Sequence, residues 1–527
     1  MRRVKKILKY SILIWMLTSC QEFLEPVSQS EYVPNEVKSL DELLLGEAYA
    51  GAYFVDANFY SVLGLFDDDV AIRRDWAGDD SEEDAVLQLR LAFSWDPTML
   101  DEFNNYDVYS QVYEKILGCN AALDYVDGVD GSEDDKNRVR GQALALRSYF
   151  YWFLVNLYGQ PYGYNADALG VPLKLNSDLQ DKGMPRNTVG EVYDQIEHDL
   201  LEAERFYKAL PEDKQNLHDN RVNLPFIQLM LSRVYLYMEN WEQAYVYGKK
   251  IIDDYSYDVL DLNSLESPEY TGYYNFFTWN NPEVLFLFGN IYDVARLPYY
   301  LGFIRYENKI DDWSETYNYI LPVASDSLLG TYEDADLRKI HYLMLPPSPD
   351  GRGADKDYRA AYSKFPIQGV GNYNLNYNAG AGLWGTAFKV TEAYLNAAEA
   401  AAMLYGERQS EYMAQAQNLM TDLRTKRFPL GTPSVAVTET NPDALIQLVR
   451  DERRRELCFE NHRWFDLRRY GMKEIKHVWY DESGHAIEYT LQQNDPGYTL
   501  LIPRTAFTYN SSMVQNEIRS TNTDDNE

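Results

Sequence analysis

The sequence contains few of the residues that build metal sites, disulfide frameworks or nucleic-acid-binding surfaces. Its 527 residues include three cysteines and six histidines, and neither kind shows the spacing of a zinc site or of a disulfide-stapled domain. Basic residues are also in deficit, because 49 Lys and Arg stand against 82 Asp and Glu, a formal charge of −33. Such a chain repels phosphate backbones, so we expect no nucleic-acid partner.

Catalytic and cofactor-binding motifs are equally scarce. Residues 380–385 formally match GxGxxG, but the polar stretch before them alternates with Tyr and does not resemble the buried strand of a βαβ unit. The sequence contains no HExxH, EF-hand or GxSxG motif. The acidic runs at 67–69 and 79–80 lack the spacing of a calcium loop. We therefore expect no metal and no cofactor, with a structural calcium ion as the alternative left open.

Beyond its N-terminus the chain lacks an apolar run of the roughly 20 residues needed to span a bilayer. The N-terminus itself has five basic residues, a short apolar run from Tyr10 to Leu17, and then Thr18, Ser19 and Cys20. This order is typical of a secretory signal and resembles the bacterial lipobox, whose cysteine is acylated. We expect residues 1–19 to be removed, Cys20 to carry the lipid anchor, and residues 20–38 to form a tether.

Apolar and aromatic residues are abundant, at 45% and 14% of the chain, and Tyr alone occurs 45 times. Their spacing predicts a mainly α-helical protein with helices near 103–127, 137–158 and 188–206. Thr188 and Glu191 form the pattern of a capping box at the start of the last of these. Two further pairs, 224–238 with 241–253 and 386–405 with 410–426, have the pattern of tetratricopeptide-like hairpins, which bury their apolar faces by stacking.

Four segments carry a family resemblance. The most specific is Leu448 to Gly471, LVRDERRRELCFENHRWFDLRRYG, which is similar to the Arg- and Glu-rich C-terminal signature of the SusD/RagB family. Residues 141–162, 231–244 and 390–401 resemble, in the family's order, its aromatic-rich helix, its repeat hairpin and the helix before the signature. The chain end departs from the family pattern, since Gln515-Asn516 is followed by Glu517-Ile518 in place of Pro-Gly-Tyr.

The resemblance implies one SusD-like domain with a helical N-terminal part (39–260), a loop-rich region (261–385) and a RagB/SusD C-terminal part (386–527). It also implies a lipoprotein on the outer face of the outer membrane. Such a protein captures an oligosaccharide or polysaccharide and passes it to a SusC-like TonB-dependent transporter without catalysis. Two alternatives stay open: a surface glycoside hydrolase, which needs two carboxylates about 5–10 Å apart, and a tetratricopeptide-type scaffold for protein partners.

The charged residues of the signature have the spacing of a structural ion-pair network. Asp451 and Arg455 are four residues apart on the predicted helix, and Glu452 and Arg455 are three apart, so each pair shares a helix face. Buried charges persist only when they are paired. The residues assigned to this network are Arg450, Asp451, Glu452, Arg453, Arg455, Glu456, Arg463 and Asp466.

Two loop regions, 73–106 and 273–319, contain the candidates for sugar contacts. Aromatic rings cover the CH faces of a sugar, and neighbouring amides and acids bind its hydroxyl groups. The candidate residues are Trp76, Trp95, Asn104, Trp279, Tyr299, Trp313 and Tyr317. Trp95 and Trp313 lead this set because each is next to an Asp in polar surroundings.

Overall fold

The computed structural model describes residues 34–49, 63–72, 90–99, 108–179, 183–266, 274, 276–290, 303–310, 313–320, 322–343, 384–407, 409–480 and 485–519. Cys20 and the tether up to residue 33 lie outside these residues. The longer helices are α5 (Val108–Tyr125), α6 (Glu133–Tyr158), α8 (Val189–Lys208), α10 (Leu224–Tyr237), α11 (Trp241–Asp254), α14 (Val390–Gly406), α15 (Tyr412–Thr425) and α16 (Pro442–Leu457). None of the helices described combines the length and apolarity that a membrane crossing requires.

Shorter elements connect these helices. The short α-helices are α2 (Val37–Leu43), α7 (Tyr162–Asn165), α9 (Glu212–Gln215), α13 (Asp326–Leu329), α17 (Arg463–Arg469) and α18 (Arg504–Tyr509). Single π or 3₁₀ turns are η1 (Leu44–Ala48), η2 (Leu63–Leu65), η4 (Leu262–Ser264), η6 (Lys339–Leu343), η7 (Pro433–Val435) and η8 (Pro496–Tyr498). The strands are β1 (Val70–Ile72), β2 (Val284–Asn290), β3 (Phe303–Ile310), β4 (Trp313–Ile320), β5 (Pro322–Ala324), β6 (Trp384–Lys389), β7 (Ile475–Tyr480) and β8 (Ala486–Leu491).

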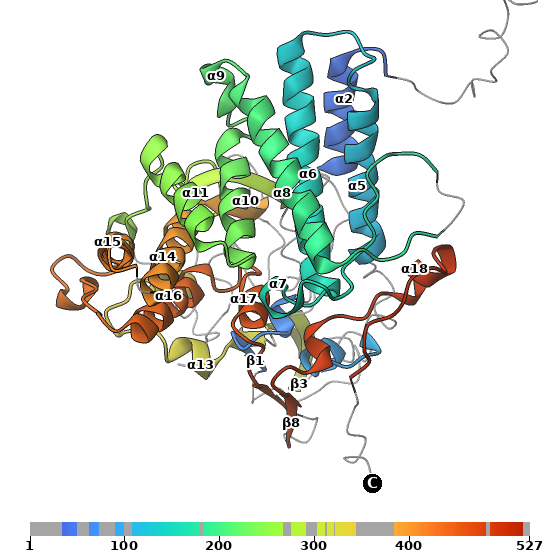
Figure 1. The fold of residues 1–527 in the computed structure, drawn as a ribbon. Coiled ribbons are helices and arrows are strands. Elements are labelled where there is room, and N and C mark those ends of the chain that lie inside the picture. The colour runs from blue at the N-terminus through green and yellow to red at the C-terminus, as the bar shows by residue number, and fades with distance from the viewer. Residues whose placement is uncertain are drawn as a thin grey trace, which may run out of the picture.

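The long helices pack in a continuous series, which confirms the prediction of a mainly α-helical protein. Helix α5 packs on α6, α6 on α8, α8 on α10, and α10 on α11, and the series continues through α14 to α15 and α16 (Figure 1). Helix α6 is at its centre, because every residue from Gly141 to Tyr158 is buried. The capping box at the start of α8 forms as predicted, with Thr188 and Glu191 each bonded to the other's backbone N–H.

Small residues set the closest approaches between these helices. A Cβ atom added at Gly141 of α6 would lie 2.5 Å from the ring of Tyr207 on α8. That ring cannot move aside freely, because Tyr207 is buried and its hydroxyl donates to the carbonyl of Val222.

Replacing Gly141 with Ala is therefore expected to destabilise the protein by about 1–3 kcal/mol through overpacking, although Ala is the better helix former. Chemical denaturation followed by circular dichroism measures the change. Gly46→Ala is the matched control, because no atom lies within 4 Å of the added methyl group. A Gly141→Ala variant as stable as the wild type would show that the α6–α8 contact has room to relax.

The strands form four two-stranded antiparallel ribbons, β1–β5, β2–β6, β3–β4 and β7–β8. Four of these strands lie wholly in the region 261–385, where the sequence predicted mostly irregular loops. Ribbon β2–β6 pairs Phe286 with Phe388, and β1–β5 pairs Val70 with Ala324. Pairing partners so distant in sequence leave no local periodic signal, which explains why β2 and β5 were missed; β3 and β4 pair locally, as a hairpin.

The first helix begins at Val37 with no side-chain cap, so Ser39 and Glu42 lie inside the helix. Near the C-terminus a 3₁₀ turn ends at Tyr498 and α18 begins at Arg504, with no helix or strand between them.

Candidate glycan-binding site

Buried arginines join all four segments that resemble the family. Arg233 of α10 forms a two-bonded ion pair with Glu392 of α14, with both N–O distances 2.6 Å. Arg453 of α16 donates to the side-chain oxygen of Asn396 on α14 at 2.8 Å. Arg468 of α17 donates to two backbone carbonyl oxygens at the C-terminal end of α6. The charged signature therefore fastens helices that are far apart in sequence.

Glu452 and Glu456, one turn apart on α16, lie at the centre of a fully buried ion-pair network. Glu456 contacts Arg338 at 3.0 Å and Arg427 at 2.7 Å. Glu452 lies within ion-pair distance of three guanidinium groups, those of Arg338 (2.6 Å), Arg424 (2.9 Å) and Arg455 (2.7 Å). Burial alone would raise the pKa of Glu452, but these three arginines hold it well below its usual range.

Another buried carboxylate, Glu399 of α14, forms ion pairs with Arg469 at 2.7 Å and with Arg450 at 3.1 Å. Burial opposes its ionisation, yet Arg469 and Arg450 lower the pKa of Glu399 to about 2. The stability that these pairs contribute is therefore present above about pH 4.5 and is lost as the pH falls toward 2.

Asp451 does not pair with Arg455, contrary to the prediction from their spacing. Asp451 accepts a hydrogen bond from Gln447 on the exposed side of α16. Arg455 instead contacts Glu452 and donates to the carbonyl of Thr331. The other partners were missed because they lie far along the chain: Arg338, Arg424, Arg427, Arg469 and Glu399.

The β1–β5 ribbon brings together the ends of the two loop regions that hold most of the predicted sugar contacts. The first region leaves β1 after Ile72, and the second enters β5 at Pro322, the residue paired with Ile72. The side chain of Ser325, just after β5, donates to the carbonyl of Asp68, just before β1, at 2.6 Å. Ile72 and Pro322, which flank the two regions in the described part of the chain, therefore lie side by side.

Two arginines of the signature bind the acidic residues that come just before β1. Arg463 of α17 binds both carboxylate oxygens of Asp68 at 2.6 and 3.0 Å, and Arg454 of α16 binds Asp69 at 2.7 Å. Arg454 also reaches the hydroxyl of Ser327 at 3.2 Å. These acids thus neutralise arginines, and among the described residues no three His, Cys, Asp or Glu side chains are grouped to hold a metal ion. Residues 79–80 lie outside the part that the structure describes.

Trp95 is buried, so the prediction that it stacks on a sugar was wrong. It is 3% exposed, its indole N–H donates to the carbonyl of Phe66 at 2.9 Å, and its ring stacks on His477 at 4.2 Å. Phe93 stacks on His477 as well, at 4.0 Å. The neighbouring Asp suggested a solvent-exposed position, but the ring is buried and is bonded to the backbone a few residues before β1.

The other candidates fall into three groups. Trp313 and Tyr317 lie on β4, where they pair with Ile310 and Tyr306 of β3. Trp279 is half-buried, and its indole N–H donates to the side-chain oxygen of Asn220 at 2.7 Å. Trp76, Asn104 and Tyr299 lie outside the described residues.

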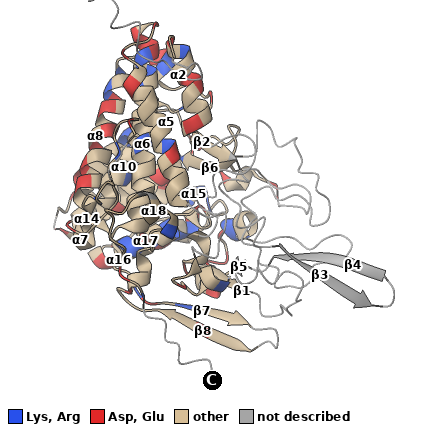
Figure 2. Ribbon diagram, turned by 90° about the vertical axis from the view of Figure 1, so that its right-hand side faces the viewer, with Lys and Arg blue, Asp and Glu red and all other residues tan. Residues whose placement is uncertain are grey.

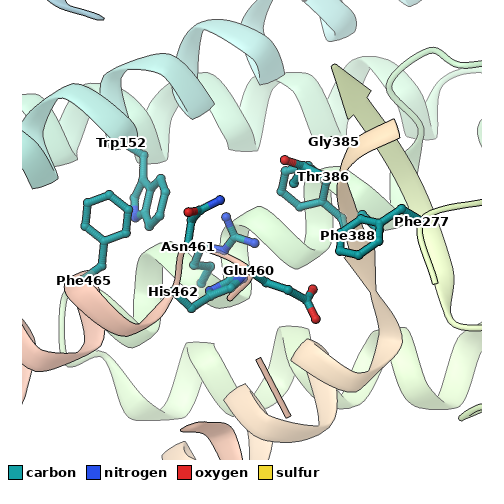
Figure 3. Close-up of a pocket in the computed structure, with 11 residues that line it drawn as sticks. Trp152, Phe277, Gly385, Thr386, Phe388, Glu460, Asn461, His462 and Phe465 are labelled. Atoms are coloured by element: carbon teal, nitrogen blue, oxygen red, sulfur yellow. The ribbon is translucent and has the colours of Figure 1, made fainter. Parts of the chain in front are cut away.

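A small pocket between α6, β6 and the α16–α17 connection is lined by aromatic and polar residues (Figure 3). Its volume is about 20 Å³, room for one water molecule and not for a sugar ring. Two buried polar atoms at its wall, Nε1 of Trp152 and Oγ1 of Thr386, have no hydrogen-bond partner among the described residues. Glu460 is the one carboxylate among the described residues that line it, and it is paired with Lys389 at 2.7 Å. These lining residues therefore lack the carboxylate pair of a glycosidase.

Two family models match the chain. One, described as "Starch-binding associating with outer membrane", matches residues 22–236, and the SusD family model matches residues 342–523. A SusD-like protein of Formosa agariphila is 22% identical over 512 residues, which cover 89% of this chain and 90% of that protein.

Solved SusD structures share the fold. A SusD superfamily protein of Bacteroides thetaiotaomicron has a TM-score of 0.66 at 20% identity and covers 92% of this chain and 100% of its own. A SusD-like carbohydrate-binding protein of Bacteroides vulgatus scores 0.65 at 21% identity, with 91% and 97% covered. A laminarin-binding SusD-like protein scores 0.61 at 20% identity, with 92% and 99% covered.

The matched regions contain the aromatic-rich helix α6, helix α10 up to Leu236 and the charged helices α16 and α17. Buried arginines join these helices, either directly or through α14, as the bonds of Arg233, Arg453 and Arg468 show. The chain therefore belongs to the SusD/RagB family.

Proposed function

We propose that this protein is a glycan-binding lipoprotein of the outer-membrane surface, which captures an oligosaccharide or polysaccharide and delivers it to a SusC-like transporter. The observation that carries the proposal is the common origin of the two aromatic loop regions at the β1–β5 ribbon. The second region contributes Trp313 and Tyr317 on β4, and aromatic rings suit a chain of sugars, whose apolar faces recur along its length. The family membership and the laminarin-binding structural relative support the same ligand class.

Delivery and anchoring rest on the N-terminus and on the family. Acylation of Cys20 would hold the body close to the membrane, because two or more acyl chains make a stable anchor. A tethered body raises the local concentration of captured glycan at the transporter. The proposal requires no bound cofactor and no bond cleavage.

The two alternatives fit the described residues less well. A hydrolase needs paired carboxylates facing an open cleft, whereas Glu452, Glu456 and Glu399 are buried and each is held by two or more arginines. A protein-binding scaffold would offer an open concave helical surface, but β2 and β6 cover the inner side of α6 and α10 with Phe288 and Phe388.

Binding of the purified mature chain to a glycan array, followed by titration calorimetry with the best ligand, tests the proposal. We expect saturable binding of a neutral glycan and no release of reducing ends on prolonged incubation. Release of reducing ends that stops on replacement of one carboxylate would establish a hydrolase instead. Binding of peptides with indifference to every glycan would establish a scaffold.

A further inference from the structure

A row of three nearly parallel rings lies on the surface away from the β1–β5 ribbon. His218 is exposed, and it stacks on the half-buried Trp279 with ring centroids 4.7 Å apart and an angle of 15° between the planes. The ring of Tyr257 is also nearly parallel to that of His218, with centroids 6.3 Å apart and an angle of 19° between the planes. Rings of three separate segments, after α9, after α11 and before β2, thus share one orientation.

Hydrogen bonds at the ring edges fix this orientation. The Trp279 indole N–H donates to the amide oxygen of Asn220 at 2.7 Å, and the Tyr257 hydroxyl donates to the amide oxygen of Asn216 at 3.0 Å. Each bond uses the oxygen of the amide, so the NH₂ group at the other end is left as a donor beside the rings. A surface whose side chains are already fixed loses little conformational entropy when a ligand binds.

The rings form an uncharged patch on a strongly acidic protein. Burial lowers the pKa of His218, while Asp219 raises it, so the imidazole is neutral at pH 7. Asp219 is itself paired with Arg138. A neutral patch of rings with amide donors at its edge suits an uncharged polyol with CH faces, and the formal charge of −33 disfavours anionic ligands.

We infer that Trp279, His218 and Tyr257 form a second saccharide-binding surface, separate from the loops of the β1–β5 ribbon. Helix α9, just before His218, lies at the opposite end of the molecule from β1 in Figure 1. The inference rests on the proposed function and deepens it. Two separated surfaces would hold one long glycan at two points, and the second contact raises the overall affinity for long chains without affecting short ones.

Affinity electrophoresis of the full-length mature chain in gels that contain starch or laminarin tests this inference, together with calorimetry using maltotriose or laminaritriose. Trp279→Ala and His218→Ala are each expected to weaken the retention by polysaccharide about tenfold and to leave trisaccharide affinity within about twofold. Trp279→Phe, which keeps a ring, is expected to restore most of the retention. Tyr164→Ala is the matched control, because Tyr164 is a 55% exposed ring on α7.

Each other result has a definite meaning. Unchanged polysaccharide retention in both Trp279→Ala and His218→Ala would overturn the second surface while leaving the proposed function intact. An equal loss for trisaccharide and polysaccharide would place these rings in the primary site and would also overturn it. A wild-type chain that neither gel retains and that binds no glycan of the array would contradict the proposed function and, with it, this inference.

Discussion

Replacing Glu456 with Gln is expected to destabilise the protein by about 3–5 kcal/mol, the usual cost of removing one partner of a buried ion pair. The carboxylate of Glu456 is fully buried and forms ion pairs with Arg338 at 3.0 Å and with Arg427 at 2.7 Å. Gln is nearly the same size, so the expected loss comes from two guanidinium groups deprived of a negative partner. Denaturant titration of the purified variant measures the loss.

Asp451→Asn on the same helix is the matched control. Asp451 bonds to Gln447 at the surface, so its replacement is expected to change the unfolding free energy by less than about 0.5 kcal/mol. The double replacement of Glu456 and Arg427 by Gln is expected to cost less than the sum of the two single changes, because the two charges stabilise one another. A Glu456→Gln variant with wild-type stability would show that the network contributes little to the fold.

Replacing Trp313 with Ala is expected to weaken glycan binding by about 10- to 100-fold, since one stacked ring contributes about 1.5–3 kcal/mol. Trp313 opens β4, and Tyr317 follows it four residues later on the same strand. The hairpin β3–β4 precedes β5, and Arg454 of α16 donates to the hydroxyl of Ser327, three residues after β5, at 3.2 Å.

Trp313→Phe is expected to retain most of the affinity, and Trp313→Ala is expected to leave the circular dichroism spectrum and melting temperature unchanged. Calorimetry with the best array ligand provides the comparison. Unchanged affinity in both Trp313→Ala and Tyr317→Ala would move the glycan site away from β4, without bearing on the family assignment.

Much of the helical fold could be predicted because its signals are local. The Thr188–Glu191 capping box and the Asn240 turn between α10 and α11 lie within a few residues of the helices they start. The β1–β5 ribbon could not be predicted, because β1 pairs with β5 some 250 residues later and each of the two strands has three residues. Asp and Glu positions are spread along the long helices, with Lys and Arg among them (Figure 2), as the charged composition leads one to expect.

The site was only partly predictable, for a similar reason. Helical spacing located the charged signature, but it could not show that Arg454 and Arg463 support Asp68 and Asp69 nearly 400 residues earlier. For Trp95, a neighbouring Asp was a poor guide to exposure, because alternate residues of one segment face opposite environments. The ring row at His218 left no sequence signal, since its members come from three separate segments.

The central claim is that this protein binds neutral glycans through aromatic rings and cleaves none of them. Calorimetry of the mature chain with its best array ligand, with a reducing-end assay run on the same samples, tests that claim most directly. We predict a saturable isotherm that Trp313→Ala weakens at least tenfold, with the ligand recovered intact. An isotherm indifferent to every ring replacement, or a ligand shortened at the end of the titration, would contradict it.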